Sequence, residues 1–106
     1  MSKRVGFERH WRFRARPESR DTFEALYGSE GAWAKLFSRH PGFRGTELQR
    51  VPDAPLEYLL IDRWESRRAW DAFRREHAAA YEELDRRCGA LTSSEELVRE
   101  VDLPAS

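Results

Sequence analysis

Hydrophobic and polar residues alternate along residues 7–14, which predicts a β-strand with one apolar face. Phe7, Trp11 and Phe13 share that face. Arg9 falls among them, while its neighbours along the chain fall on the other face. The strand therefore places one charged side chain among aromatic ones.

Residues 16–42 predict two short helices. Apolar residues recur there at helical spacing: Phe23, Leu26, Tyr27, Trp33, Leu36 and Phe37. Gly28 ends the first helix, of about ten residues, which follows a break at residues 16–19. Ser29 is the expected cap of the second helix, and residues 41–42, Pro-Gly, are its expected end.

Three more strands are expected in the rest of the chain. Residues 43–51 and 56–64 have the composition of strands and are separated by turn-forming residues 52–55, which predicts an antiparallel hairpin. Residues 97–101 alternate again and predict a last strand before a frayed tail, residues 103–106.

One long helix is predicted between the hairpin and the last strand. Ser66 can cap it, and Gly89 is a plausible end. Its apolar stripe advances by threes and fours through Ala69, Trp70, Phe73, His77, Ala80, Tyr81, Leu84 and Cys88. A histidine and a tyrosine thus occupy positions where aliphatic residues are expected, so this face either packs a polar-tipped core or lines a pocket.

This order of elements predicts an α+β, ferredoxin-like split βαβ fold with a four-stranded antiparallel sheet. We expect a single domain over residues 1–106, with a core at about 7–102. The helices cover one face of the sheet, and a second copy is expected to cover the other in a homodimer. Leu48, Leu59 and Ile61 are the expected apolar contacts of that open face.

Composition narrows the classes of function. Lys+Arg and Asp+Glu both number 19, so no net charge favours generic nucleic-acid binding. No apolar run is long enough to suggest a membrane span, and the first residues do not resemble a secretory signal. Cys88 is the single cysteine, which excludes an internal disulfide and suits a reducing compartment. We therefore expect a soluble, cytoplasmic protein with no nucleic-acid or membrane partner.

The order and spacing of three motifs resemble a known family. These motifs are residues 23–27 (Phe-Glu-Ala-Leu-Tyr), residues 41–48 (Pro-Gly-Phe followed by Gly-Thr-Glu-Leu) and residues 64–66 (Trp-Glu-Ser) followed by Ala69 and Phe73. The chain is similar, over residues 7–102, to the antibiotic biosynthesis monooxygenase domain of the dimeric α+β barrel superfamily. That resemblance implies a dimeric α+β barrel. Its members include cofactor-independent oxygenases of polycyclic aromatic polyketides, quinol oxygenases and haem-degrading enzymes.

The haem-degrading members have an asparagine, a tryptophan and a histidine in their pocket. By the resemblance, the asparagine position falls on Arg9 and the tryptophan position on Phe73. Only the histidine has a candidate counterpart, His77, and its spacing from Trp64 is shorter than the haem-degrading members require. Haem degradation is therefore the less favoured activity.

Three polar residues are candidates for catalysis. His77 could act as a general base, with Tyr81 one helical turn further on, and Arg9 could stabilise an anionic substrate. Each also has a structural interpretation: a hydrogen-bonded core histidine, an aromatic core residue with its hydroxyl at the rim, and an arginine paired with Glu47 or Asp62.

Aromatic side chains suggest the class of ligand. The candidates for substrate binding are Trp11, Trp33, Phe37, Trp64 and Phe73. Around a cavity they favour a flat, conjugated molecule, and otherwise they fill the core. The three histidines, at 10, 40 and 77, lack the spacing of a metal site, and we expect no metal.

The leading hypothesis is a monooxygenase that needs no bound cofactor and acts on an aromatic, polyketide-like or quinone-type small molecule. A non-catalytic or stress-associated dimer that binds a small molecule is the alternative. A structural dimer whose aromatic residues simply fill the core is the third possibility.

Overall fold

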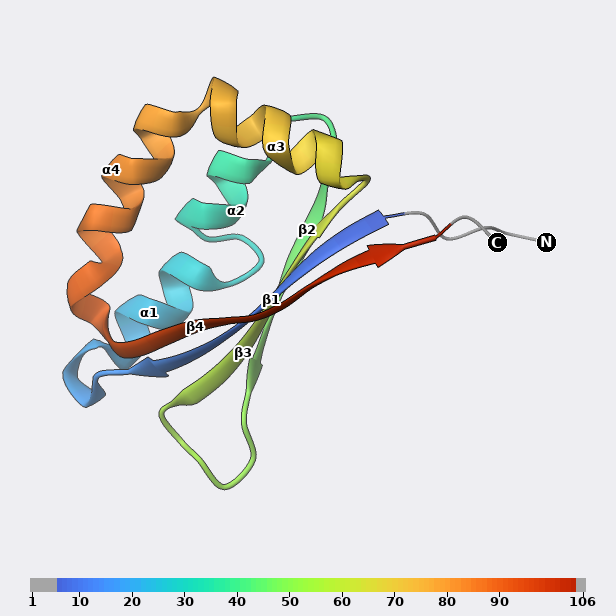
Figure 1. Ribbon diagram of the computed structural model, residues 1–106. Coiled ribbons are helices and arrows are strands. Elements are labelled where there is room, and N and C mark those ends of the chain that lie inside the picture. The colour runs from blue at the N-terminus through green and yellow to red at the C-terminus, as the bar shows by residue number, and fades with distance from the viewer. Residues whose placement is uncertain (1–5, 105–106) are drawn as a thin grey trace.

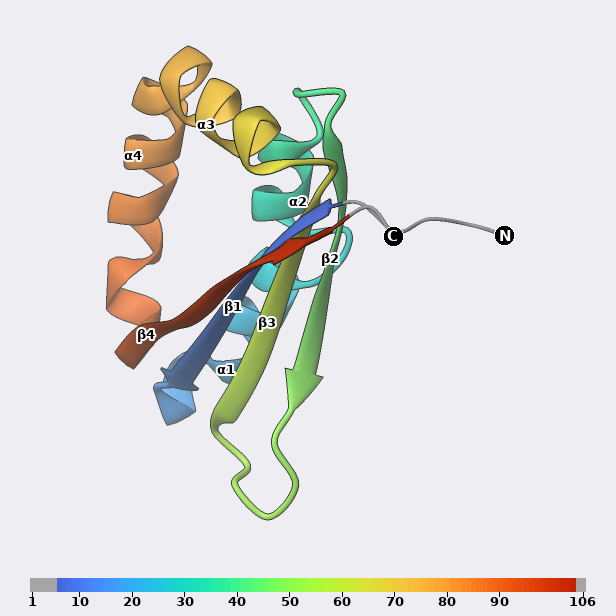
Figure 2. The ribbon, with the colours of Figure 1, turned by 45° about the vertical axis from the view of Figure 1, so that its right-hand side comes forward.

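The computed structural model describes residues 6–104 as one antiparallel sheet with all helices on one face (Figure 1). The strands are β1 (Gly6–Ala15), β2 (Phe43–Arg50), β3 (Glu57–Trp64) and β4 (Thr92–Leu103). The helices are α1 (Arg20–Tyr27), α2 (Ala32–Phe37), α3 (Arg67–Glu76) and α4 (Ala78–Cys88), with short 3₁₀ turns at Pro17–Ser19 and Gly89–Leu91. The strand order is β2-β3-β1-β4, which confirms the predicted α+β, ferredoxin-like fold. Seen from the side, the other face of the sheet is bare (Figure 2).

The predicted long helix is two helices. His77 has φ −122° and ψ 29°, outside the helical range, and it separates α3 from α4. Ser66 begins α3 as predicted, since its hydroxyl accepts a hydrogen bond of 3.0 Å from the backbone N–H of Ala69. Tyr81 therefore lies in the first turn of a new helix.

The predicted start of α2 at Ser29 is also wrong, because Gly31 is its N-cap residue. A Cβ atom at Gly31 would lie 2.4 Å from the carbonyl oxygens of Ala25 and Leu26. Only glycine permits α2 to begin this close to the end of α1.

The last strand is longer than the sequence suggests. β4 covers twelve residues, and most of them are exposed because β4 is an edge strand. Its ladder to β1 runs from Gly6↔Leu103 to Ala15↔Thr92. Of the predicted tail, Leu103 closes the strand, and residues 105–106 lie outside the described residues.

The core between helices and sheet is mainly aromatic. Trp64 is 1% exposed, and its ring contacts those of Phe37, Trp70 and Phe73 at centroid distances of 5.3–5.5 Å. Large rings at these distances contribute both buried area and favourable edge contacts. This packing fixes the helices against β1 and β3.

The open face of the sheet is largely ionic. Arg63 on β3 binds Glu47 on β2 at 3.0 Å and Glu8 on β1 at 3.2 Å, and Glu8 also contacts His10 at 2.9 Å. Leu59 and Ile61 lie on this face as predicted, since they alternate with the buried residues of β3. The placement of Leu48 there is wrong. Leu48 pairs with Leu60 and packs against the core, because it lies on the helix side of β2.

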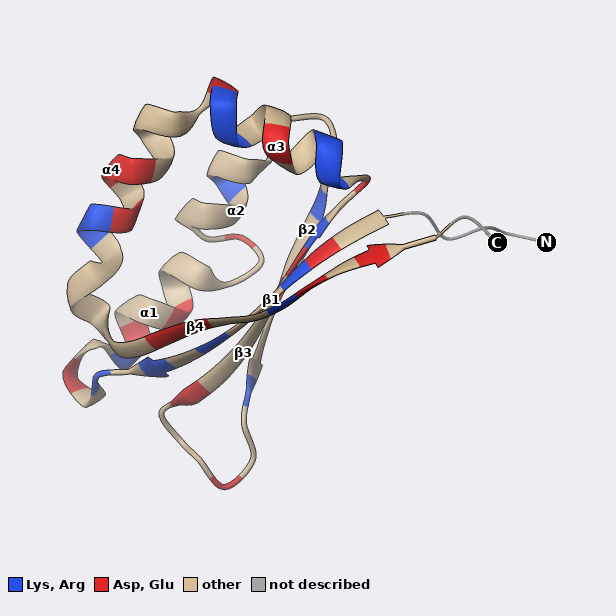
Figure 3. Cartoon of the chain, in the orientation of Figure 1, with Lys and Arg blue, Asp and Glu red and all other residues tan. Residues whose placement is uncertain are grey.

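Positive and negative residues are interspersed along the helices and strands (Figure 3). Within residues 6–104, no helix has the length and apolar character that crossing a bilayer requires.

Replacement of Phe73 by alanine tests the core. Phe73 is fully buried, so we expect Phe73→Ala to lower the free energy of unfolding by about 3–5 kcal/mol through lost burial and an unfilled cavity. Urea unfolding followed by tryptophan fluorescence measures this change. The control is Glu82→Ala on the exposed side of α4, with an expected change below about 0.5 kcal/mol. Equal effects of the two substitutions would contradict the described packing.

Candidate active site

A cavity of about 40 Å³ lies between the helices and the sheet. Its walls combine aromatic rings with polar groups from both layers. They are formed by Arg9, Trp11, Phe13, Tyr27, Trp33, Phe37, Thr46, Leu60, Asp62, Tyr81, Asp85 and Glu95. Since one ordered water needs roughly 10–15 Å³ of such space, the cavity holds only a few waters in this conformation.

A row of polar residues crosses the helix side of the sheet beside this cavity. Thr46 on β2 stands opposite Asp62 on β3, Asp62 stands opposite Arg9 on β1, and Arg9 stands opposite Glu100 on β4. We call these four residues the polar row. Directly opposite side chains on one face of a sheet are close enough to interact, so the ladder itself assembles this group.

Arg9 is held in place by its surroundings. Its Nε donates to Glu100 at 3.0 Å, and the side chain is only 11% exposed. The guanidinium carbon lies 4.1 Å from the ring centre of Trp70 and 5.3 Å from that of Trp11. Aromatic faces attract a cation, which explains how a charged residue is tolerated on the apolar side of β1. The ion-pair partner is Glu100, whereas Glu47 pairs with Arg63 on the opposite face.

Asp62 is a carboxylic acid in a buried position. It is 4% exposed, and the Thr46 hydroxyl donates a hydrogen bond to its Oδ1. Burial raises the pKa of Asp62 to about 6, although the Thr46 hydrogen bond and the charge of Arg9 both act to lower it. At neutral pH it is therefore a carboxylate, but a more basic one than usual.

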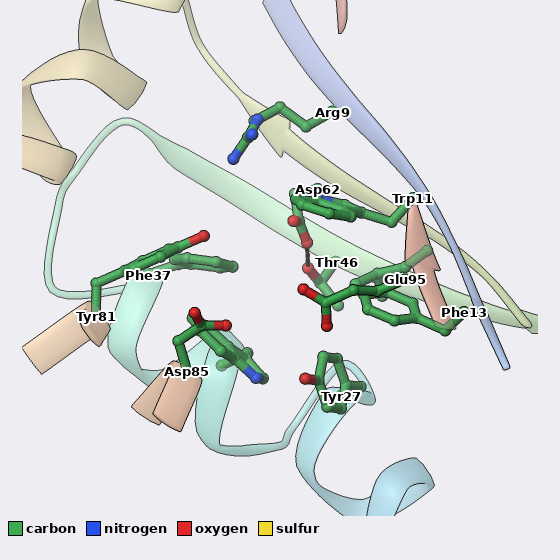
Figure 4. A pocket seen from close by; sticks show the side chains of 12 residues that line it. Arg9, Trp11, Phe13, Tyr27, Phe37, Thr46, Asp62, Tyr81, Asp85 and Glu95 are labelled. Atoms are coloured by element: carbon green, nitrogen blue, oxygen red, sulfur yellow. Dashed lines mark hydrogen bonds between the residues drawn. The ribbon is translucent and has the colours of Figure 1, made fainter. Parts of the chain in front are cut away.

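Tyr81 completes the polar side of the cavity. Burial raises the pKa of its phenol, and the charges of Arg9 and Arg74 offset part of this rise, so the hydroxyl keeps its proton at neutral pH. In Figure 4 the guanidinium of Arg9, the carboxylate of Asp62 and the hydroxyl of Tyr81 lie around the same space. Two hydrogen-bond donors and one acceptor thus face a common point.

The outer side of the cavity is acidic. Burial and the nearby charge of Asp85 raise the pKa of Glu95. These two carboxylates also border a second depression of about 370 Å³, lined by the hydroxyl residues at the start of β4. The small cavity and a wider polar groove between α4 and β4 therefore share the side chains of Asp85 and Glu95.

The structure brings five of the eight predicted site residues to this cavity: Arg9, Tyr81, Trp11, Trp33 and Phe37. Trp64 and Phe73 lie deeper in the aromatic core and do not line the cavity. His77 lies at the break between α3 and α4, with its ring 5.2 Å from that of Phe73, and it does not line the cavity either.

Two residues of the site, Thr46 and Asp62, are not among the site residues predicted from the sequence. Asp62 alternates with Leu60 and Trp64, so a carboxylate on the apolar face of a strand was the available signal. Asp85 and Glu95 lie on exposed positions whose pattern carries no such signal. Within residues 6–104, no three potential metal-ligating side chains cluster together.

Substitution of Asp62 by asparagine tests its electrostatic state. The folded pKa, about 6, lies above the ordinary 3.8, so folding favours the protonated form, and the stability that Asp62 contributes falls as the pH rises from about 4 to 6. Asparagine does not ionise, so Asp62→Asn should remove this loss. We therefore expect the difference in free energy of unfolding between the variant and wild type to be roughly 2–3 kcal/mol more favourable to the variant at pH 7.5 than at pH 4. Urea unfolding at both pH values measures it.

Asp53→Asn is the control for this comparison, since Asp53 is an exposed turn residue at φ 63°, a conformation that asparagine also adopts. It measures the effect of the same aspartate-to-asparagine change at an exposed position outside the cavity. A pH-independent effect of Asp62→Asn would show that the buried carboxylate is not destabilised.

Comparison with known proteins agrees with the fold. A Bordetella bronchiseptica protein that carries the name of the antibiotic biosynthesis monooxygenases superimposes with a TM-score of 0.72 at 24% identity, over 92% of this chain and 95% of that one. SnoaB of Streptomyces nogalater, described as a cofactor-independent oxygenase, gives 0.69 at 25% identity over 94% and 92%. Rv0793 of Mycobacterium tuberculosis gives 0.66 at 25% identity over 93% of each chain.

No curated protein matches the chain. The family model described as antibiotic biosynthesis monooxygenase matches residues 7–84, which is most of the chain and includes β1, the β2-β3 hairpin, α3 and the start of α4. The chain belongs to the antibiotic biosynthesis monooxygenase family.

Proposed function

We propose that the protein is a cofactor-independent monooxygenase of an aromatic, polyketide-like or quinone-type small molecule. The observation that carries the proposal is the convergence of Arg9, Asp62 and Tyr81 on an aromatic-lined cavity. Family membership and the similarity to SnoaB, a cofactor-independent oxygenase, support it.

The polar groups suit a substrate that reacts as an enolate. Deprotonation of a carbon that is conjugated with a carbonyl places negative charge on the carbonyl oxygen, and the N–H groups of Arg9 and the O–H of Tyr81 are donors that can bind it. Such preorganised donors typically account for a 10²–10³-fold rate effect each, because they stabilise charge that develops during the reaction. The aromatic walls bind the flat rings on either side.

Anthrone is a simple compound of this class. It has one reactive methylene opposite a carbonyl, and its enolate is fully aromatic. The enolate transfers an electron to dioxygen, the resulting radicals combine to a peroxide at the methylene carbon, and loss of water leaves a second carbonyl. The sum is anthrone plus O₂ giving anthraquinone plus water, so the substrate itself supplies all the electrons.

A tricyclic substrate is larger than the cavity described above. Binding therefore requires side chains of the cavity wall to move. Tyr81 is one that can move, because it is half-buried in the first turn of α4. The neighbouring groove between α4 and β4 gives the rest of a larger substrate a place to lie.

We also propose that the enzyme is a homodimer joined through the open face of the sheet. Leu59 and Ile61 and the charged network of Arg63 lie on that face. Native mass spectrometry is expected to show a species of twice the 12.5 kDa chain mass. A monomer at micromolar concentration would contradict this assembly.

Oxygen uptake with anthrone tests the activity. We expect purified protein, treated with a chelator, to consume one O₂ per anthrone and to form anthraquinone faster than the buffer background. Arg9→Lys and Tyr81→Phe should each lower kcat by about 10²-fold. Arg9→Lys changes the geometry of the N–H donors to the enolate oxygen, and Tyr81→Phe removes the O–H donor. Binding of anthrone without oxygen uptake would instead support the alternative of a non-catalytic binding protein.

Two matched controls accompany these variants. Arg75→Lys changes an exposed arginine of α3, and Tyr58→Phe removes a hydroxyl that bonds Glu24 away from the cavity. Both should keep wild-type kcat. His77→Ala tests the role of general base that the sequence predicts for His77. Because His77 does not line the cavity, we expect this variant to retain activity. Loss of activity in a folded variant would restore His77 as a candidate base.

A further inference from the structure

We infer that the carboxylate of Asp62 is the base of this site, which removes the proton from the substrate carbon that dioxygen then attacks. The inference rests on the proposed function, because it assigns a role in the same reaction. It concerns a residue that the sequence interpretation considered only as a partner for Arg9.

The geometry leaves Asp62 one oxygen for this task. Thr46 donates to Oδ1, and none of the residues 6–104 donates a hydrogen bond to Oδ2. The side chain lines the cavity beside the space that Arg9 and Tyr81 also face (Figure 4). A substrate whose carbonyl oxygen is bound by these two donors therefore has the carboxylate beside its ring system.

The same surroundings make Asp62 a suitable base. A buried carboxylate with a pKa of about 6 is ionised at neutral pH and accepts a proton more readily than an exposed aspartate. Arg9, on the opposite strand, prevents a larger rise and keeps the group ionised. Thr46 fixes the orientation of the carboxylate, because the β2-β3 register holds both residues side by side.

Other candidates for the base fit less well. Tyr81 keeps its proton and is a donor. Asp85 and Glu95 lie on exposed positions at the outer side of the cavity. The partial burial that raises the pKa of Glu95 leaves its side chain open to water, which competes for its lone pairs. Among the described residues that line the cavity, Asp62 is the one buried carboxylate.

The proton balance of the reaction closes through Asp62. The carboxylate takes the first methylene proton, and the electron pair moves into the ring and carbonyl oxygen. After dioxygen has added, the acid returns this proton to the peroxide. Asp62 then takes the second proton from the same carbon as the O–O bond breaks, and the departing hydroxide receives it as water.

Anaerobic hydrogen exchange tests the inference without oxygenation. Anthrone is incubated with the protein in oxygen-free D₂O buffer, and loss of its methylene signal is followed by proton NMR. We expect wild type to accelerate the exchange and Asp62→Asn to lower the enzymatic rate at least about 10²-fold. The wild-type rate should rise with pH around an apparent pKa of about 6, and this dependence should disappear in Asp62→Asn.

Thr46→Val is a second variant that leaves the carboxylate in place. It removes a hydrogen bond that lowers the pKa of Asp62, so the rise of the exchange rate should move to higher pH. A purely structural role of Asp62 would not produce this shift. Asp53→Asn, far from the cavity at the β2-β3 turn, is the control and should keep the wild-type rate and pH profile.

The outcomes separate this inference from the proposed function. Exchange that depends on Asp62 without oxygen uptake in air would support the base and contradict the monooxygenase. An exchange rate of folded Asp62→Asn within threefold of wild type, or an unshifted profile in Thr46→Val, would overturn the assignment. So would a wild-type rate equal to that of the buffer.

Discussion

The ladder of the sheet sets four polar residues side by side on its helix face: Thr46, Asp62, Arg9 and Glu100, the polar row. It places a cation and a carboxylic acid on the apolar side of a sheet, where removal from water costs several kcal/mol per charged group. Pairing with Glu100, two aromatic faces around Arg9 and the Thr46 hydrogen bond offset that cost. A fold that needed only a packed core would gain from apolar residues at these positions.

The helical layer covers the polar row and adds the hydroxyl of Tyr81 to it. The aromatic core around Trp64 fixes α3, and the break at His77 redirects the chain so that Tyr81, in the first turn of α4, lines the cavity above the sheet. Tyr81 lies with its ring 5.1 Å from Trp33 and 6.1 Å from Trp70, and so it closes the cavity over Arg9 and Asp62. The donor Arg9 and the base Asp62 thus come from the sheet and the donor Tyr81 from the helices, so a substrate between the two layers contacts all three.

Local patterns predicted much of this fold and part of the site. Strand alternation identified Arg9 among aromatic residues, and Ser66 marked the start of α3, since both signals act over a few residues. No glycine or proline next to His77 marks the break between α3 and α4, so the sequence pattern reads through it as one helix. An apolar stripe also cannot distinguish Phe37, which lines the cavity, from Phe73, which fills the core. Asp62 acquires its significance only from the register that sets it between Thr46 and Arg9.

A crystal structure with anthraquinone, the stable product of the anthrone reaction, would show whether this cavity is an oxygenase site. We expect the rings to lie between the helices and the sheet, with one carbonyl oxygen within about 3 Å of both the Arg9 guanidinium and the Tyr81 hydroxyl. The opposite ring carbon should lie beside Asp62. Anthraquinone bound on another surface, or bound here with its oxygens turned away from Arg9 and Tyr81, would contradict this expectation.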